Sequence, residues 1–305
     1  MRTVGITGGT GFIGSYLTQL LEKNNYRVIV FTHSFRNKVG SENISYAYWD
    51  PARSECDIDA LQKVGAMIHL AGEGIADKRW TDKRKQEITQ SRVQTTNFLV
   101  RLLTKKAIHC KTLISASAIG FYGPDRQGFI PFKEDSASYN DFLANVCALW
   151  EAAAEKAEHS LRTIILRFGI VMGKEKGAFA EFVKPTSFGI APILGSGKQV
   201  MSWIHVNDLA NMILFALENE KLQGIYNAVA PYPITQKQLM RSIAKIKSGI
   251  IIPVPVPAFL LNLMLGEMST ELLKSCTVSA DKIQQAGFSF QYGNVDKAVK
   301  AILGK

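Results

Sequence analysis

Three glycines at a spacing of three residues are the feature of this sequence that best suits ligand chemistry. Gly8, Gly11 and Gly14 follow the short apolar run at residues 3–6, and apolar side chains at helical spacing come next. A strand, a tight glycine-rich turn and a helix bring backbone N–H groups to the positive end of the helix dipole, where a pyrophosphate can bind. The predicted contacts of such a ligand are Gly8, Thr10, Gly11, Phe12, Ile13 and Gly14. The alternative is an ordinary turn, because the GxxGxxG spacing differs from the GxGxxG of the usual dinucleotide fingerprint.

The second predicted strand spans residues 27–31, and the residues that follow it indicate whether NAD(H) or NADP(H) would bind. In an NAD site an acidic side chain at this position holds the ribose 2′-hydroxyl, but no acid occurs between Glu22 and Glu42. The polar and basic side chains that stand there instead are Thr32, His33, Ser34, Arg36 and Lys38. Hydroxyl donors and positive charge suit a 2′-phosphate, so the sequence favours NADP(H) over NAD(H). The alternative is that Arg36 and Lys38 only solvate a surface loop.

The segments around these residues predict the fold that must position them. Strand-like runs alternate with helical runs, which is typical of an α/β protein whose parallel sheet is covered by helices on both faces. The predicted strands span residues 3–6, 27–31, 44–48, 67–70, 112–115 and 162–168. The predicted longer helices span residues 81–106 and 141–159, the second with Asp141 as its N-cap. We therefore expect a Rossmann-like, doubly wound parallel sheet.

A change of composition near residue 173 predicts the domain organisation. Glycine and proline become more frequent there, and the regular alternation lapses until an apolar run returns at residues 225–229. A last helical stretch, at residues 258–274, follows three closely spaced prolines. The sequence predicts a Rossmann-like domain at residues 1–172, with a return to the sheet near 203–229, and a smaller C-terminal lobe at residues 173–305.

Composition and charge limit the partners. The 36 basic and 26 acidic residues give a net charge of +10, which favours an anionic cofactor and substrate. Nucleic-acid binding is the alternative, but the basic residues are dispersed without a nucleic-acid motif, so we expect a small-molecule substrate. Apolar runs shorter than a membrane span and a strand-like start predict a cytoplasmic protein without membrane attachment. The four scattered cysteines predict no metal site. The oligomeric state is left open, with a homodimer as one possibility.

Several sequence blocks, in order, resemble the extended short-chain dehydrogenases/reductases. Besides the glycine turn they are HLAG at 69–72, SAS at 115–117 with YG at 122–123, and WIHVNDL at 203–209. Further blocks, WEAA at 150–153 and GSGKQ at 195–199 among them, resemble the atypical branch called the epimerase family. Residues 265–268 and 286–288 are similar to its C-terminal domain of unknown function, at about 250–300. The resemblance covers nearly the whole chain and implies an NAD(P)-dependent sugar-nucleotide epimerase or oxidoreductase with a small lobe over the cofactor.

The resemblance also implies further contacts. The positions that would lie along the cofactor are Leu70, Ala71, Gly72, Glu87, Arg92, Ser115 and Val171. For Glu87 and Arg92 the alternative is a solvated helix face. Trp203 and His205 would line the substrate pocket, and Asp208 is expected to cap the helix that follows.

The proton-transfer pair of the resembled superfamily is missing. Its members place Tyr and Lys on one helix at YxxxK spacing, and the lysine lowers the pKa of the phenol. In this chain the two positions fall on Leu143 and Cys147, neither of which can transfer the proton. Tyr139 precedes the helix, but the residue four positions later is Leu143 instead of lysine.

Three other residues are candidates for acid–base work, and each has a structural alternative. Ser117 ends the fifth predicted strand, where its alternative role is hydrogen bonding within the strand end. Glu73 follows the fourth strand and could instead order a loop, while Tyr122 could instead pack in the core. Two functions therefore remain open: an enzyme acting on a small carbonyl or sugar nucleotide, and a non-catalytic NADP(H)-binding sensor.

Overall fold

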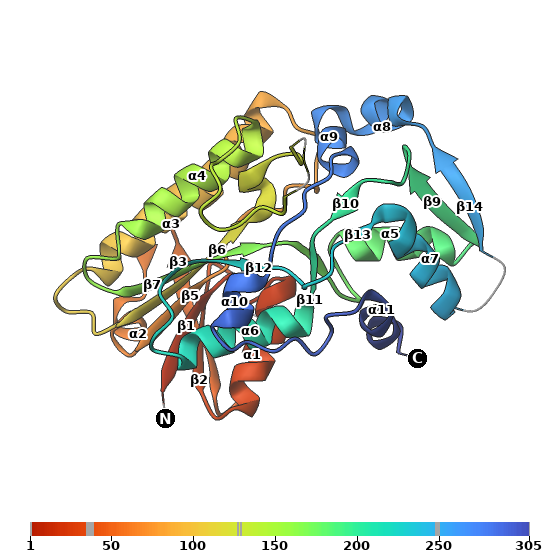
Figure 1. Ribbon diagram of the computed structural model, residues 1–305. Coiled ribbons are helices and arrows are strands. Elements are labelled where there is room, and N and C mark those ends of the chain that lie inside the picture. Colours follow the sequence, from red (N-terminus) through yellow and green to blue (C-terminus); the bar gives the residue numbers. More distant parts are fainter. Residues whose placement is uncertain (1, 35–39, 127, 129, 248–250, 305) are drawn as a thin grey trace.

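The computed structural model describes residues 2–34, 40–126, 128, 130–247 and 251–304 (Figure 1). Its centre is an eight-stranded sheet in the order β12-β7-β6-β5-β1-β2-β3-β4. Neighbouring strands are parallel except β3 and β4, which pair in antiparallel register. The strands are β1 (Thr3–Thr7), β2 (Arg27–Thr32), β3 (Ile44–Asp50), β4 (Glu55–Cys56), β5 (Ala66–His69), β6 (Thr112–Ala118), β7 (Arg162–Phe168) and β12 (Gly224–Ala228). All six strands predicted from the first part of the sequence are present, and the α/β fold prediction is confirmed.

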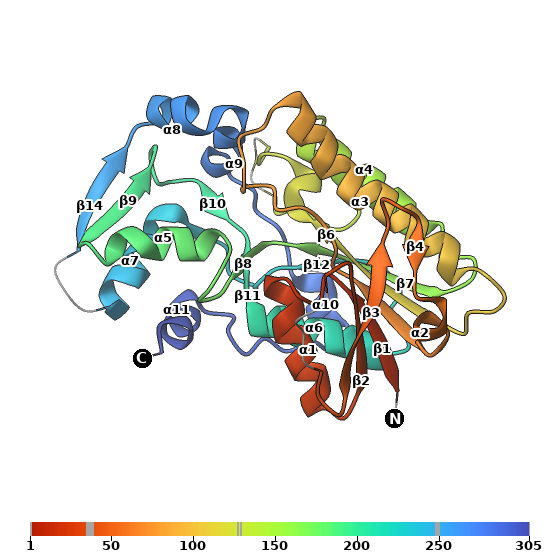
Figure 2. The ribbon, with the colours of Figure 1, turned by 180° about the vertical axis from the view of Figure 1, so that it is seen from behind.

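Helices cover both faces of this sheet (Figures 1 and 2). One layer consists of α1 (Phe12–Lys23), α6 (Val206–Glu218) and α10 (Asp281–Gln285). The other consists of α2 (Ile58–Gln62), α3 (Asp82–Leu103) and α4 (Phe142–Glu155). Asp141 caps α4 as predicted, since its carboxylate accepts a hydrogen bond from Ala144 N at 2.9 Å. Burial of the strands on both faces explains why they consist mostly of apolar residues.

A second group of helices and strands packs around its own buried core. Its helices are α5 (Ala178–Thr186), α7 (Gln236–Lys247), α8 (Ala258–Leu265), α9 (Ser269–Leu273) and α11 (Val295–Leu303). Its strands form the pairs β9 (Ile190–Leu194) with β14 (Ile252–Val256) and β10 (Val200–Met201) with β13 (Ile234–Thr235). Strands β8 (Ile170–Met172) and β11 (Trp203–His205) form a third pair.

Two segments of the C-terminal part differ from the expected layout. The predicted helix at 258–274 is divided, because Gly266 adopts φ +62° between α8 and α9. Residues of the segment 276–288 pack into the core of the large sheet, so a second stretch of the C-terminal part returns there besides β12. Within the described part of the chain, none of the helices combines the length and apolarity that crossing a bilayer requires.

Candidate functional site

The glycine turn between β1 and α1 is closely packed. Gly8 has φ +72°, and a Cβ there would lie 2.7 Å from the carbonyl carbon of Leu70. A Cβ on Gly14 would lie 2.3 Å from Gly8 O, so the helix start and the turn leave no room for a side chain. Gly11 occupies the N-cap position of α1 without a side-chain cap. The N–H groups of the first helical turn therefore face the carboxyl edge of the sheet without a side-chain acceptor.

The predicted cofactor residues follow the carboxyl ends of neighbouring strands. Thr32 ends β2, and its hydroxyl accepts a hydrogen bond from Ser34 N at 3.3 Å. His33 and Ser34 are exposed, whereas Arg36 and Lys38 lie outside the described residues. Leu70 and Ala71 follow β5 and touch the glycine turn. Because β5, β1 and β2 are adjacent in the sheet, these residues form one continuous edge.

A buried histidine that the sequence analysis did not single out ties this edge together. His69 Nδ1 lies 2.6 Å from Thr7 Oγ1, and His69 Nε2 lies 2.9 Å from Thr96 Oγ1. The three residues belong to β5, β1 and α3. Burial lowers the pKa of His69 to about 4, so the imidazole is neutral at pH 7. It fixes the two strands and the helix beside the glycine turn.

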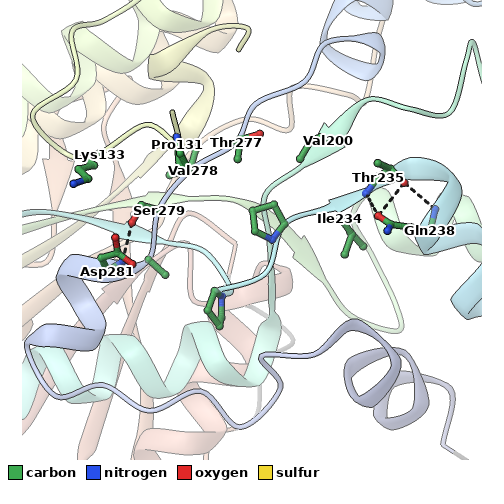
Figure 3. A pocket seen from close by; sticks show the side chains of 13 residues that line it. Pro131, Lys133, Val200, Ile234, Thr235, Gln238, Thr277, Val278, Ser279 and Asp281 are labelled. Carbon is green, nitrogen blue, oxygen red and sulfur yellow. Dashed lines mark hydrogen bonds between the residues drawn. The ribbon is translucent and has the colours of Figure 1, made fainter. Parts of the chain in front are cut away.

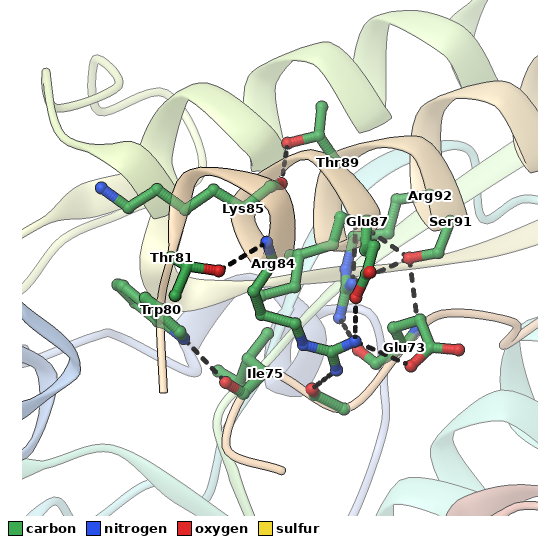
Figure 4. A network of polar contacts seen from close by, with 12 residues as sticks. Glu73, Ile75, Trp80, Thr81, Arg84, Lys85, Glu87, Thr89, Ser91 and Arg92 are labelled. Atoms are coloured by element: carbon green, nitrogen blue, oxygen red, sulfur yellow. Dashed lines mark hydrogen bonds and ion pairs between the residues drawn. The ribbon is translucent and has the colours of Figure 1, made fainter. Parts of the chain in front are cut away.

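Glu73 belongs to a polar network between the loop after β5 and the start of α3 (Figure 4). Arg84 Nη1 lies 3.2 Å from Glu73 Oε2 and 3.0 Å from Glu87 Oε2. Arg84 Nη2 also donates to Gly74 O at 2.6 Å. The hydrogen bond from Arg84 lowers the pKa of Glu87. These contacts favour a loop-ordering role for Glu73, and they give Glu87 a protein partner.

Arg92 lies on the same helix, two turns further along (Figure 4). Its Nη2 donates to Glu73 O at 2.9 Å, and its Nη1 donates to Ile88 O at 3.1 Å. A Cβ on Gly72 would lie 3.3 Å from Arg92 Cζ. The guanidinium therefore lies against the exposed loop that follows β5, instead of on a solvated helix face.

Ser117 points into the protein interior. Its side chain is buried, and its hydroxyl donates to Glu151 Oε1 at 2.5 Å. Arg167 Nε and Nη2 donate to the two oxygens of the same carboxylate at 2.8 and 2.7 Å. Burial acts to lower the pKa of Arg167, but the hydrogen bonds and charge of Glu151 outweigh it and raise this pKa. The arrangement holds the Ser117 hydroxyl proton toward Glu151, which favours the hydrogen-bonding alternative for this residue.

Tyr122 completes the same buried network. Its hydroxyl accepts from Arg167 Nη1 at 2.8 Å and donates to Asn227 Oδ1 at 2.6 Å. Asn227 N donates in turn to Glu134 Oε1 at 2.8 Å, which satisfies an edge position of β12. Burial raises the pKa of Tyr122 to about 12. A fully buried phenol with both hydrogen bonds made favours the packing alternative over proton donation.

Sequence reasoning missed Arg167 and Asn227 as members of this network. A signal for Arg167 was present, because a charged residue stands in the otherwise apolar strand β7. Glu151 likewise stands on a helix face that is otherwise apolar, next to Trp150 and Ala154. Charged residues at such positions are almost always paired.

The two positions of the missing proton-transfer pair are buried. Leu143 packs in a cluster with Trp80, Ile88 and Met268. Burial raises the pKa of the Cys147 thiol to about 12. Both side chains therefore belong to the core. Tyr139 is 42% exposed.

The side chains expected to line a substrate pocket are packed in the interior. Trp203 is buried and its indole donates to Tyr232 O at 3.0 Å. His205 caps α6, since its Nδ1 accepts from Asn207 N at 3.0 Å, and burial lowers its pKa to about 4. The structure thus shows a packing contact for Trp203 and a capping contact for His205, while their place in a substrate pocket stays a prediction. The prediction of Asp208 as the cap is wrong, because its carboxylate accepts from the backbone of residues 291 and 292.

Two remaining predicted contacts lie at the ends of other strands. Ser115 is buried in β6, and its hydroxyl donates to Ala116 O at 3.3 Å. Val171 lies in β8 and pairs with Ile204. Two residues further on, a Cβ on Gly173 would lie 2.5 Å from the ring of Phe12. This segment therefore lies at the start of α1.

A cavity of about 480 Å³ lies apart from these residues (Figure 3). It is bordered by the segments around residues 131–133, 231–238 and 277–281, and includes Lys133 and Asp281. The predicted cofactor residues are absent from its lining. Among the described residues, no group of three or more His, Cys, Asp or Glu side chains is arranged to hold a metal ion.

Comparison with known families agrees with this geometry. Residues 4–228 match the sequence profile described as the NAD dependent epimerase/dehydratase family. Residues 256–302 match a domain of unknown function, DUF1731.

Individual relatives match over nearly the full chain. The epimerase family protein YfhF of Bacillus subtilis is 37% identical, with 98% of this chain and 97% of that protein covered. The chloroplastic SDR39U1 homolog of Arabidopsis thaliana is 36% identical over 99% of this chain and 86% of that protein. The crystal structure of human epimerase family protein SDR39U1 with NADPH superposes with a TM-score of 0.87 at 27% identity, covering both chains completely.

Proposed function

Because this chain belongs to the NAD dependent epimerase/dehydratase family, we propose that it binds NADP(H) and catalyses an epimerisation or another redox step. The proposed substrate is a sugar nucleotide or another small carbonyl compound. The observation that carries the proposal is the turn at residues 8–14, where the neighbouring backbone leaves no room for a side chain at Gly8 or Gly14 and the start of α1 has no side-chain cap. The human relative with the similar fold was crystallised with NADPH.

The chain's own residues would bind and orient the dinucleotide. The first turn of α1 would donate N–H groups to the pyrophosphate, and the hydroxyl groups after β2 would lie near the 2′-phosphate. Leu70, Ala71 and Gly72 would lie beside the following ribose at the end of β5. Bound NADP(H) would supply the hydride that the protein itself cannot provide. The acid–base group stays a proposal, with Glu73 the most exposed of the three candidates.

Calorimetric titration with NADPH and NADH tests the cofactor proposal. We expect NADPH to bind more tightly, because no carboxylate follows β2 to repel its 2′-phosphate. Equal affinities, or tighter NADH binding, would contradict the choice of cofactor. Single-turnover oxidation of bound NADPH across a panel of aldehydes, ketones and sugar nucleotides tests the reaction.

A second function is favoured by one specific observation. The two positions where relatives of the superfamily hold tyrosine and lysine carry the buried side chains of Leu143 and Cys147. A protein that binds NADP(H) without turning it over, and so senses the cofactor, needs no proton-transfer pair. NADPH binding together with the absence of hydride transfer to every carbonyl in the panel would select this function over the enzymatic one.

A further inference from the structure

Helix α8 is apolar on both its inner and its outer face. Its sequence, AFLLNLML at residues 258–265, contains a single polar residue, Asn262, which is hydrogen-bonded to Ser269. Leu261 and Leu265 pack inward against buried apolar residues. A helix at the surface of a monomeric protein normally carries polar residues on its outer face, whereas a helix that is apolar all round is normally buried.

The outer face of α8 forms an apolar stripe. Phe259 and Leu263 are one turn apart, and so are Leu260 and Met264, which places all four side chains on one face of the helix. Phe259 is 68% exposed, and Leu263 and Met264 are each 71% exposed. Large apolar side chains that gather in the open in this way mark a contact with another surface.

The exposed apolar surface continues from α8 onto the ribbon of β9 and β14. Ile190 pairs with Ile252, so both side chains lie on one face of the ribbon, and Val254 follows on that face two residues later. Strand β14 leads directly into α8, and both lie at the outer edge of the molecule in Figures 1 and 2. We call the eight exposed apolar residues of these elements and of the turn before β9 the α8 surface: Phe188, Ile190, Ile252, Val254, Phe259, Leu260, Leu263 and Met264.

The free edge of β14 is unsuited to pairing with a strand of another chain. Ile252 N donates to Gly189 O at 2.8 Å, and alternate residues of a parallel strand turn their N–H groups toward the same neighbour. The residues that turn the other way are Pro253 and Pro255, and proline has no N–H to donate. A partner must therefore bind the α8 surface by packing of side chains and not by strand addition.

The charges around the α8 surface do not suit an anionic membrane. No lysine or arginine occurs between Lys247 and Lys274, although the chain has a net charge of +10. The two acids in this interval, Glu267 and Glu271, form ion pairs with Lys85 and Lys274. Helices that lie in a membrane interface carry basic residues on their polar face. An apolar surface depleted in charged residues is instead typical of homodimer interfaces.

We propose that the α8 surface is the interface of a homodimer, in which it packs against the same surface of a second copy of this chain. At roughly 100 Å² for each exposed side chain, the eight residues provide on the order of 800 Å². A stable interface takes about 800 Å² from each partner, so the α8 surface has the required size. A two-fold axis brings the same surface of both copies together, which covers both apolar stripes at once.

Sedimentation velocity over a range of protein concentrations tests the proposal. We expect the wild-type protein to sediment as a dimer. Phe259→Glu and Leu263→Glu should each raise the dissociation constant about a hundredfold or more, because a carboxylate would be buried at the interface without a partner. Glutamate is a good helix former, so both variants should keep the wild-type circular dichroism spectrum.

Leu149→Glu is the matched control for these variants. Leu149 is also exposed, but it lies on α4, so the Leu149→Glu protein should remain a dimer. A monomeric wild-type protein at every concentration would overturn the proposal, and so would dimers of wild-type affinity in both α8 variants. Dissociation of the Leu149→Glu protein would place the interface on α4 instead.

Co-sedimentation with phosphatidylglycerol vesicles distinguishes a lipid surface from a second copy of the chain. We expect no binding of the wild-type protein to these vesicles. Binding of the wild-type protein that is lost in Phe259→Glu would assign the α8 surface to a membrane and overturn the proposal.

Discussion

Arg167 on β7 and Glu151 on α4 form a two-point ion pair with donor–acceptor distances of 2.8 and 2.7 Å, and the two side chains are only 2% and 4% exposed. The pair joins the sheet to the helix that carries Leu143 and Cys147, the two positions of the missing proton-transfer pair. It also holds the hydroxyl groups of Ser117 and Tyr122, so four side chains depend on one another.

Removing one partner of this pair should strongly destabilise the fold. Arg167→Met leaves the Glu151 carboxylate buried without a counter-ion, which we expect to lower the free energy of unfolding by about 3–5 kcal/mol. Lys245→Met removes one partner of an exposed ion pair with Asp296 and should cost at most about 1 kcal/mol. Urea denaturation of both variants measures the two values. Similar decreases of the unfolding free energy in the two variants would contradict the importance assigned to the buried pair.

Substituting Gly11 should remove cofactor binding without unfolding the protein. A Cβ at Gly11 would meet only Gly8 O, at 3.2 Å, so a backbone shift of a few tenths of an ångström would accommodate a side chain. The valine of Gly11→Val would nevertheless occupy the space that the pyrophosphate needs at the start of α1. Calorimetry with NADPH should show the loss, with circular dichroism unchanged.

Gly65→Val is the matched control for this experiment. A Cβ at Gly65 would lie 3.7 Å from Thr3 O, and this residue is at the opposite end of β5 from the expected ligand. The Gly65→Val protein should bind NADPH like the wild type. If the Gly11→Val protein also binds NADPH like the wild type, the glycine turn has a purely structural role.

Leu143 should contribute to stability and not to proton transfer. It is 8% exposed and packs against residues of α3 and the segment after α8, so Leu143→Ala should cost about 2–4 kcal/mol. Leu149→Ala, on the same helix but 53% exposed, should change the unfolding free energy far less. Thermal unfolding and NADPH titration of both variants check this. A Leu143→Ala protein of wild-type stability that has lost hydride transfer would instead place this residue in the reaction.

The fold could be predicted from the sequence because its signals are local and periodic. Apolar strands, Asp141 before α4 and the glycine turn each depend on a few neighbouring residues, and all appear where expected. The divided helix at 258–274 was missed, because its division depends on the backbone angle of a single glycine, φ +62°.

The candidate site was less predictable because its contacts join distant segments. Glu151 meets Ser117 across 34 residues, and Tyr122 meets Asn227 across 105 residues. Strand-end position alone could not show whether the Ser117 side chain faces a ligand or the interior. The same holds for His205, whose burial against Tyr292 depends on a segment 87 residues later in the chain.

Acid should destabilise the protein through its buried histidines. Burial lowers the pKa of His205 from 6.5 to about 4, so between these values the unfolded chain binds a proton that the folded protein does not. The contribution of this histidine to stability is therefore present above pH 6.5 and is lost as the pH falls toward 4. In His205→Asn, which keeps a good N-cap residue, the decline of the unfolding free energy over this range should be shallower by about one proton. Urea denaturation at half-unit intervals of pH measures the wild type and the variant. A His205→Asn slope equal to that of the wild type would show that this imidazole takes up its proton equally in the folded and unfolded states.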